Sequence, residues 1–79
     1  MLYNERKHET LKYFSRREWI RPAQWAIDAG VYPIRRSYTY LKRLHRWSLL
    51  ERGHDFTGHV VYRLSPRGAR WLLRNGGGV

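Results

Sequence analysis

The chain contains no cysteine among its 79 residues. This absence excludes disulfide bonds and thiolate metal sites, so packing and hydrogen bonds alone must hold the fold. Acidic residues are also few, because six Asp and Glu stand against sixteen Lys and Arg and leave a net charge of +10. Such an imbalance favours an anionic partner, whether nucleic acid, a membrane surface or an acidic protein, and charge alone does not choose among them.

Long hydrophobic runs are lacking as well. Residues 1–7 turn polar at once instead of forming the apolar part of a secretory signal, and no later stretch reaches the length that spans a bilayer. We therefore expect a soluble protein without membrane attachment, in the cytoplasm and associated with the nucleoid. The chain also lacks a phosphate-binding glycine loop, a clustered carboxylate pair and a cysteine nucleophile, so we expect neither enzymatic activity nor a cofactor.

What the chain does have is enough apolar material for one core. Hydrophobic residues make up 42% of it, with four Trp and six Tyr, so the chain can fold despite its charge. A chain of this length buries about 60% of its unfolded surface, or a little more, around a single core. We expect one domain over residues 1–75 and a flexible glycine-rich tail over residues 76–79.

The first part of the chain is predicted to hold a helix and a short extended segment. Asn4 is a candidate N-cap for a helix over residues 4–14, in which Leu11 and Phe14 are the core contacts. After a polar loop, residues 19–21 form a β-favouring run that is too brief for more than one bridging strand.

Proline and glycine then mark two helices and the turn between them. Pro22 suits the first turn of a short helix that stops at Gly30 in a left-handed conformation. Pro33 opens the next helix at its first position, and apolar residues recur at helical spacing over residues 34–47. Two helices joined by a glycine-containing turn of three or four residues form a candidate helix-turn-helix.

The helix predicted over residues 34–47 separates apolar from basic residues. With a step of about 100° per residue, Ile34, Ser37, Leu41, Leu44 and His45 point inward. The outward side carries Arg35, Arg36, Thr39, Tyr40, Lys42, Arg43, Arg46 and Trp47. A charged helix face is usually only solvated, but such faces normally mix both signs, and here no acidic residue lies nearby in the sequence. We therefore interpret the outward side as facing a polyanion.

A β-hairpin and a last helix complete the prediction. The hairpin covers residues 50–64 and turns at residues 54–58. Ser65 then supplies an N-cap and Pro66 the first position of a helix that reaches about Arg74. On the returning strand, the period of two places Val60, Tyr62 and Leu64 toward the core and His59, Val61 and Arg63 toward solvent.

Two segments resemble winged helix-turn-helix transcription regulators, with the PadR-like and MarR-like families as the nearest. Residues 38–52 resemble the recognition helix and first wing strand, and residues 62–69 (Tyr-Arg-Leu-Ser-Pro-Arg-Gly-Ala) resemble the second wing strand, the Leu-Ser/Thr-Pro turn and the start of the next helix. The resemblance covers about residues 10–73 and implies a mainly α (α+β) fold with a three-helix core, a short β-hairpin wing and a C-terminal helix. Ser48 departs from the family, which usually has glycine there.

The resemblance also implies a function, namely sequence-specific binding of double-stranded DNA by a small transcription regulator. If this chain docks as these families do, we expect the helix over residues 34–47 to enter the major groove and the hairpin over residues 50–64 to act as the wing. Family members usually dimerise through additional helices that are not found in this sequence, so the resemblance does not decide whether the chain forms a homodimer. The resemblance nominates Arg35, Arg36, Thr39, Tyr40 and Arg43 for base edges, Lys42 and Arg46 for phosphates, and Arg52, His54, His59 and Arg63 as secondary contacts from the wing.

Other interpretations of these residues also remain open. The chain is alternatively a winged-helix adaptor that docks an acidic protein through Trp47, Tyr40 and Trp71, or a domain that binds RNA. The wing residues are alternatively ordinary polar decoration of a hairpin. Arg16, Arg17 and Arg21 either reach flanking phosphates or are only solvated.

The remaining histidines and tryptophans have simpler expected roles. His54 and His59 lie close to Asp55, but no third ligand accompanies them, so we expect no metal site. His45 is expected at the edge of the core as a hydrogen-bonded residue, with pH sensing as the alternative. Trp19, Trp25 and Trp71 are expected to fill the core.

Overall fold

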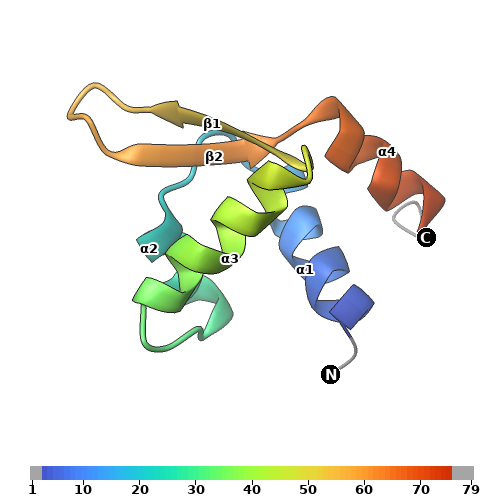
Figure 1. Cartoon of the computed structure of the whole chain (residues 1–79), viewed down its shortest axis with the longest axis horizontal. Coiled ribbons are helices and arrows are strands. Elements are labelled where there is room, and N and C mark those ends of the chain that lie inside the picture. Colours follow the sequence, from blue (N-terminus) through green and yellow to red (C-terminus); the bar gives the residue numbers. More distant parts are fainter. Residues whose placement is uncertain (1–2, 76–79) are drawn as a thin grey trace.

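The six regular elements follow one another in the predicted order (Figure 1). The computed structural model describes residues 3–75, so the tail predicted over residues 76–79 lies outside the described residues. Within that range the elements are α1 (Tyr3–Ser15), α2 (Pro22–Ala29), α3 (Arg35–Arg46), β1 (Leu50–His54), β2 (Val60–Leu64) and α4 (Pro66–Arg74). This is an α+β fold, and none of its helices in residues 3–75 is long and apolar enough to cross a membrane.

Helix ends follow the predicted proline and glycine positions, with two differences. Gly30 ends α2 in the left-handed region at φ 71°, as predicted. The prediction that Asn4 caps α1 is wrong, because α1 already begins at Tyr3. Pro33 does not take the first position of α3, because a tight turn precedes the helix, in which the Arg36 N–H donates to the Pro33 carbonyl at 3.0 Å. The helix therefore begins at Arg35.

Ser48 ends the third helix where the resembled families usually have glycine. Its φ of 63° lies in the left-handed region, which a residue with a side chain occupies at some cost. The turn is closed by the Leu49 N–H, which donates to the Leu44 carbonyl at 3.0 Å. This reversal sends the chain directly into β1.

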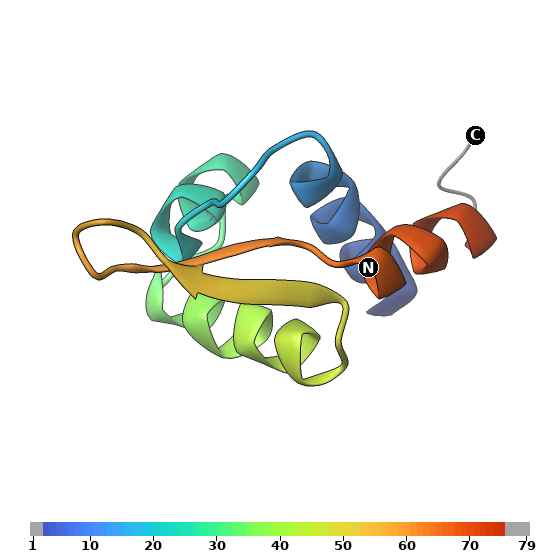
Figure 2. The same ribbon diagram turned by 90° about the horizontal axis from the view of Figure 1, so that it is seen from above.

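The two strands form an antiparallel hairpin that lies across the helices (Figure 2). The register runs from the pair Leu50 and Leu64 to the pair His54 and Val60. Ile20 adds one β-bridge beside Tyr62, with backbone hydrogen bonds of 2.8 and 2.9 Å in the two directions. The single bridging strand predicted for residues 19–21 is thus confirmed.

The core fills the space between the hairpin and the helices. Every regular element contributes to it, and the cluster of buried residues comprises Leu11, Phe14, Trp25, Leu41, Leu44, Leu49, Leu50, Tyr62 and Leu72. Ala26 is fully buried, and its small side chain suits a close approach of α2 to α3. Leu11, Phe14 and Trp25 were all predicted as core residues, and Trp71 is half-buried against the cluster.

Trp19 and Val61 contradict their predicted positions. Trp19 is 41% exposed rather than in the core, and Val61 is buried rather than facing solvent. Gly53 pairs with Val61 in the hairpin, and the Trp19 ring lies 3.0 Å from the position that a Cβ of Gly53 would take. Trp19 therefore covers the outer face of the hairpin at this pair, and this part of the outer face is shielded from solvent.

The start of α4 is joined to the end of α3 through Ser65. As predicted, Ser65 is the N-cap, since its hydroxyl oxygen accepts a hydrogen bond from the Gly68 N–H at 2.9 Å. The same hydroxyl donates to the Ser48 carbonyl oxygen. One hydroxyl thus hydrogen-bonds a backbone N–H in the first turn of α4 and a backbone carbonyl in the turn after α3.

Candidate nucleic-acid interface

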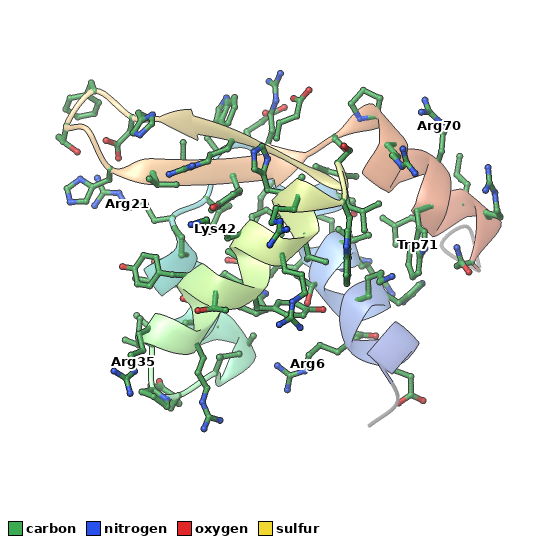
Figure 3. All side chains as sticks on the ribbon, viewed as in Figure 1. Arg6, Arg21, Arg35, Lys42, Arg70 and Trp71 are labelled. Carbon is green, nitrogen blue, oxygen red and sulfur yellow. The ribbon has the colours of Figure 1, made fainter. Side chains whose placement is uncertain are left out.

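The outer side of α3 carries exposed polar and basic side chains along its whole length. Ser37, Leu41 and Leu44 are buried on the inner side, so the predicted separation of the two sides is confirmed. We call the exposed basic residues of α3, together with Thr39, the α3 basic face; it consists of Arg35, Arg36, Thr39, Lys42, Arg43 and Arg46, and Tyr38 is also exposed on this helix. In Figure 3 the side chain of Arg35 projects outward from the amino-terminal end of the helix.

Among the described residues, no acidic side chain forms a salt bridge with a cation of the α3 basic face. The salt bridges within residues 3–75 all involve other residues, since Glu18 and Glu51 contact Arg63 and Asp55 contacts Arg21. Because no carboxylate in the described part of the chain pairs with it, the α3 basic face projects a positive potential into solvent. Pairs of opposite charge three or four residues apart usually stabilise an exposed helix face, and α3 forms no such pair within residues 3–75.

Tyr40 and His45 lie against the core rather than on the basic face. Tyr40 is half-buried, and its ring stacks on Trp25 with centroids 5.7 Å apart and planes 15° from parallel. This stack turns the ring toward α2 and away from the α3 basic face. His45 is half-buried with Nδ1 3.1 Å from the Leu50 carbonyl oxygen, which confirms the predicted hydrogen bond at the edge of the core.

Arg63, nominated as a wing contact, is held by the protein itself. Its Nε donates to Glu51 Oε1 at 2.6 Å, and Glu18 lies 3.7 Å from the guanidinium. The guanidinium also lies 4.6 Å from the centroid of the Trp19 ring. The hydrogen bond to Glu51, above all, raises the pKa of Arg63 further above its ordinary value. Of the nominated hairpin residues, Arg52, His54 and His59 stay exposed.

The hairpin tip, residues 55–59, is organised around the carboxylate of Asp55. Asp55 Oδ1 accepts hydrogen bonds from the Thr57 hydroxyl at 2.6 Å, the Thr57 N–H at 2.9 Å and the His59 N–H at 3.0 Å. Arg21 donates to Asp55 Oδ2 through Nε at 2.9 Å, so this arginine holds the tip to the start of α2. The bond from the Thr57 hydroxyl is the largest of several that hold the pKa of Asp55 well below its usual value.

His59 takes part in this arrangement, whereas His54 precedes the tip. Both side chains are exposed, and His59 Nδ1 lies 2.7 Å from the Thr57 hydroxyl oxygen. Residues 3–75 contain no group of three or more His, Cys, Asp or Glu side chains placed to hold a metal ion. Asp55 and His59 contact other residues of the turn, and Asp55 also pairs with Arg21.

Two of the three aromatic residues assigned to the adaptor interpretation meet at Lys7. The Lys7 Nζ lies 4.9 Å from the Trp47 ring centroid and 5.1 Å from that of Trp71. Tyr40 does not join them, because it stacks on Trp25. A shallow cavity of about 290 Å³ beside this cluster is lined by Arg43, Arg46 and Trp47.

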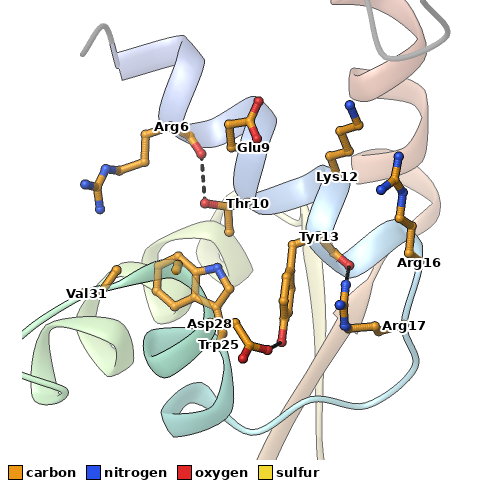
Figure 4. A pocket seen from close by; sticks show the side chains of 11 residues that line it. Arg6, Glu9, Thr10, Lys12, Tyr13, Arg16, Arg17, Trp25, Asp28 and Val31 are labelled. Atoms are coloured by element: carbon orange, nitrogen blue, oxygen red, sulfur yellow. Dashed lines mark hydrogen bonds between the residues drawn. The ribbon is translucent and has the colours of Figure 1, made fainter.

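A further cavity, which the sequence did not indicate, lies between α1 and α2 (Figure 4). Its volume is about 470 Å³, and basic side chains on its rim alternate with Glu9 and Asp28. The Tyr13 hydroxyl donates to Asp28 at 2.6 Å, and burial together with this bond raises the pKa of Tyr13 to about 12. The guanidinium carbon of Arg17 lies 4.1 Å from the centroid of the Tyr13 ring. These residues of the lining therefore contact one another. The cavity forms only where α1 and α2 pack side by side, so the sequence did not indicate it.

Comparison with protein-family models, with curated proteins and with solved structures finds no match for this chain.

Proposed function

We propose that the chain is a winged helix-turn-helix domain that binds double-stranded DNA through the α3 basic face. The observation that carries the proposal is the unneutralised row of cations on a helix whose other side is packed into the core. The order of α2, a glycine-ended turn, α3, an antiparallel hairpin and α4 supports it. We further propose that the domain acts as a transcription regulator of the cytoplasm and nucleoid, without catalytic activity.

The dimensions of α3 suit the major groove. Its 12 residues span roughly 18 Å, and the groove of B-form DNA, about 12 Å wide, accepts one helix. In the proposed complex, the amino-terminal residues Arg35, Arg36 and Thr39 meet base edges, where an arginine can bind guanine through two hydrogen bonds. Lys42 and Arg46 contact phosphates, which fix the register of the helix on the duplex.

The hairpin supplies the second part of the proposed interface. Arg52, His54 and His59 are exposed and are the residues that the hairpin offers to the backbone or to a neighbouring groove. Arg63 and Tyr40 are not part of the proposed interface, because Glu51 and Trp25 already engage them.

The salt dependence of duplex binding tests the proposal. The logarithm of the binding constant falls linearly with the logarithm of salt concentration, and each phosphate contact removed lowers the slope by about one. We expect the double variant Lys42→Ala with Arg46→Ala to reduce the slope by about two and to weaken binding to all duplexes alike. Fluorescence anisotropy with a labelled duplex at several salt concentrations measures both effects.

A matched control removes the same charge from another helix. Arg67 and Arg70 are exposed on α4, so Arg67→Ala with Arg70→Ala lowers the net charge equally without touching the α3 basic face. We expect this control to change the slope by less than one. Equal effects from the two double variants would show that only bulk charge matters, and an unchanged slope in the α3 variant would refute the proposed interface.

Binding to an acidic protein is the second candidate function. The meeting of Trp47 and Trp71 at Lys7 favours it, because aromatic rings beside a cation are suited to a protein surface that is both apolar and acidic. This candidate predicts that Trp47→Ala abolishes binding to an acidic polypeptide such as poly-glutamate while the Lys42 and Arg46 variant retains it. The DNA proposal predicts the opposite ranking with a duplex.

A further inference from the structure

The most exposed large apolar side chain of the described residues stands at the hairpin tip. Phe56 is 99% exposed, so it contributes no packing to the fold. Single exposed apolar residues are common on proteins, and their presence alone indicates nothing. Phe56 differs because the loop that presents it is among the most heavily hydrogen-bonded parts of the molecule.

The turn around Phe56 is fixed on both sides. Asp55 accepts hydrogen bonds from Thr57 and His59, and its own N–H donates to the His59 carbonyl at 2.9 Å. Gly58 adopts a left-handed φ of 88°, which closes the turn. Arg21 then ties Asp55 to the start of α2. A fixed loop loses little conformational entropy on binding, so the phenyl ring is presented in advance to a partner.

The charge of the tip does not oppose an anionic partner. Asp55 is the only acidic residue of the tip, and Arg21 pairs with it at 2.7 Å. His54 and His59 on either side are exposed and contribute no negative charge. The tip therefore offers an apolar ring without an unpaired carboxylate that would repel phosphates.

The tip also lies at the correct end of the molecule. Both Figures 1 and 2 show the hairpin tip at the same end as the amino terminus of α3, with α4 at the opposite end. The amino-terminal part of α3 is the part proposed to meet base edges. The hairpin tip and the part of α3 proposed to meet base edges therefore lie at one end of the molecule, so one duplex can engage both.

We propose that Phe56 is a wedge that enters a base step from the minor groove and kinks the duplex. This inference rests on the proposed function, since it requires that α3 first binds duplex DNA. Apolar side chains inserted in this way partly unstack a base step and bend the duplex by about 20–90°. Pyrimidine–purine steps such as TA deform most easily, so the preferred step under the tip is of this kind.

Energy transfer between the ends of a duplex tests the wedge. The probe is a duplex of about 30 base pairs with a central TA step, a donor at one end and an acceptor at the other. We expect the unmodified protein to raise the transfer efficiency on binding. Phe56→Ala still binds, with affinity lower by roughly tenfold, but leaves the duplex straight.

Two further variants make the result specific. Phe56→Leu keeps an apolar wedge, so we expect it to retain most of the bend. Leu73→Ala removes another exposed apolar side chain, 72% exposed on α4 at the far end, so we expect unchanged binding and bending. Because Phe56 makes no core contact, loss of folding does not confound its substitution.

The outcomes separate this inference from the proposed function. If the unmodified protein binds the duplex without bending it, or bends it equally with Phe56→Ala, the wedge is refuted and DNA binding by α3 stands. If neither protein binds any duplex, both proposals fall. A third outcome is that the unmodified protein binds vesicles of anionic lipid, the Phe56→Ala variant does not, and neither bends the duplex. This result overturns the wedge in favour of a membrane contact.

Discussion

Gly68 in the first turn of α4 provides a sharp test of how the helix is docked. A Cβ added at this position would lie 2.2 Å from the Leu49 carbonyl oxygen and 2.8 Å from Leu64 Cδ1. The Leu49 peptide cannot easily retreat, because its N–H donates to the Leu44 carbonyl and its own carbonyl accepts from the Ser65 N–H at 3.2 Å. Gly68→Ala must therefore push α4 away by about 1 Å, which is a strain of the overpacking kind.

The magnitude follows from the contacts that this shift disrupts. Overpacking costs about 1–3 kcal/mol, and loss of the Ser65 cap adds about 1 kcal/mol. The hydrogen bond from Ser65 to Leu49 adds about 1 kcal/mol. The gain in helix propensity from glycine to alanine returns only about 1 kcal/mol. We expect a net loss of roughly 2–4 kcal/mol, a large part of the stability of a small domain.

Urea unfolding followed by tryptophan fluorescence measures the loss directly. Arg67→Ala is the matched control, since Arg67 neighbours Gly68 in α4 but is exposed, and we expect a change within about 0.5 kcal/mol. A Gly68→Ala protein as stable as the unmodified chain would refute the close approach of α4 to the end of α3.

Two further predictions concern the hydrogen bonds of Ser65 and Asp55. Ser65→Ala removes both the cap on Gly68 and the bond to the Ser48 carbonyl, so we expect a loss of about 1–2 kcal/mol in the same urea assay, with Ser65→Thr closer to the unmodified protein. The lowered pKa of Asp55 means that its contribution to the hairpin tip is complete above its ordinary value of 3.8 and is lost as pH falls below it. Amide hydrogen exchange, corrected for the intrinsic pH dependence, should show constant protection of Thr57 and His59 from pH 7 to about pH 4.5 and weaker protection below; loss of protection near pH 6 would contradict this assignment.

The features that the sequence predicted well depend on local chemistry. The left-handed end of α2 at Gly30 and the cap at Ser65 each follow from neighbours within a few residues. The two sides of α3 follow from helical periodicity, which the absence of acidic residues between Ala29 and Leu50 makes easy to interpret. The order of elements followed because each local signal agreed with the next.

The features that were missed depend on residues far apart in the chain. Trp19 lies outside the core because Gly53, in another element, leaves room for its ring on the hairpin. Periodicity could not show this, nor that Val61, which pairs with Gly53, is buried. Asn4 failed as a cap for a local reason, since a helix can begin a residue earlier than its best capping residue.

The candidate site was predicted more completely on α3 than on the hairpin. Helical periodicity alone predicted which basic residues of α3 lie on its outer side. The partners of the hairpin residues could not be deduced from spacing. Arg63 is engaged by Glu51, and Arg21 reaches Asp55 across 34 positions of sequence. Tyr40 was predicted on the outward side, but its ring stacks on Trp25 and lies against the core.

Selection of bound duplexes from a random pool at near-physiological salt tests the central claim most directly. At this salt concentration, nonspecific charge attraction is weakened, so enrichment reports base reading. We predict that the unmodified protein enriches a defined sequence and that Arg36→Ala, which removes a proposed base contact, relaxes one position of it. An unenriched pool, or an identical enriched sequence from Arg35→Ala, Arg36→Ala and Arg43→Ala alike, would contradict sequence reading by α3.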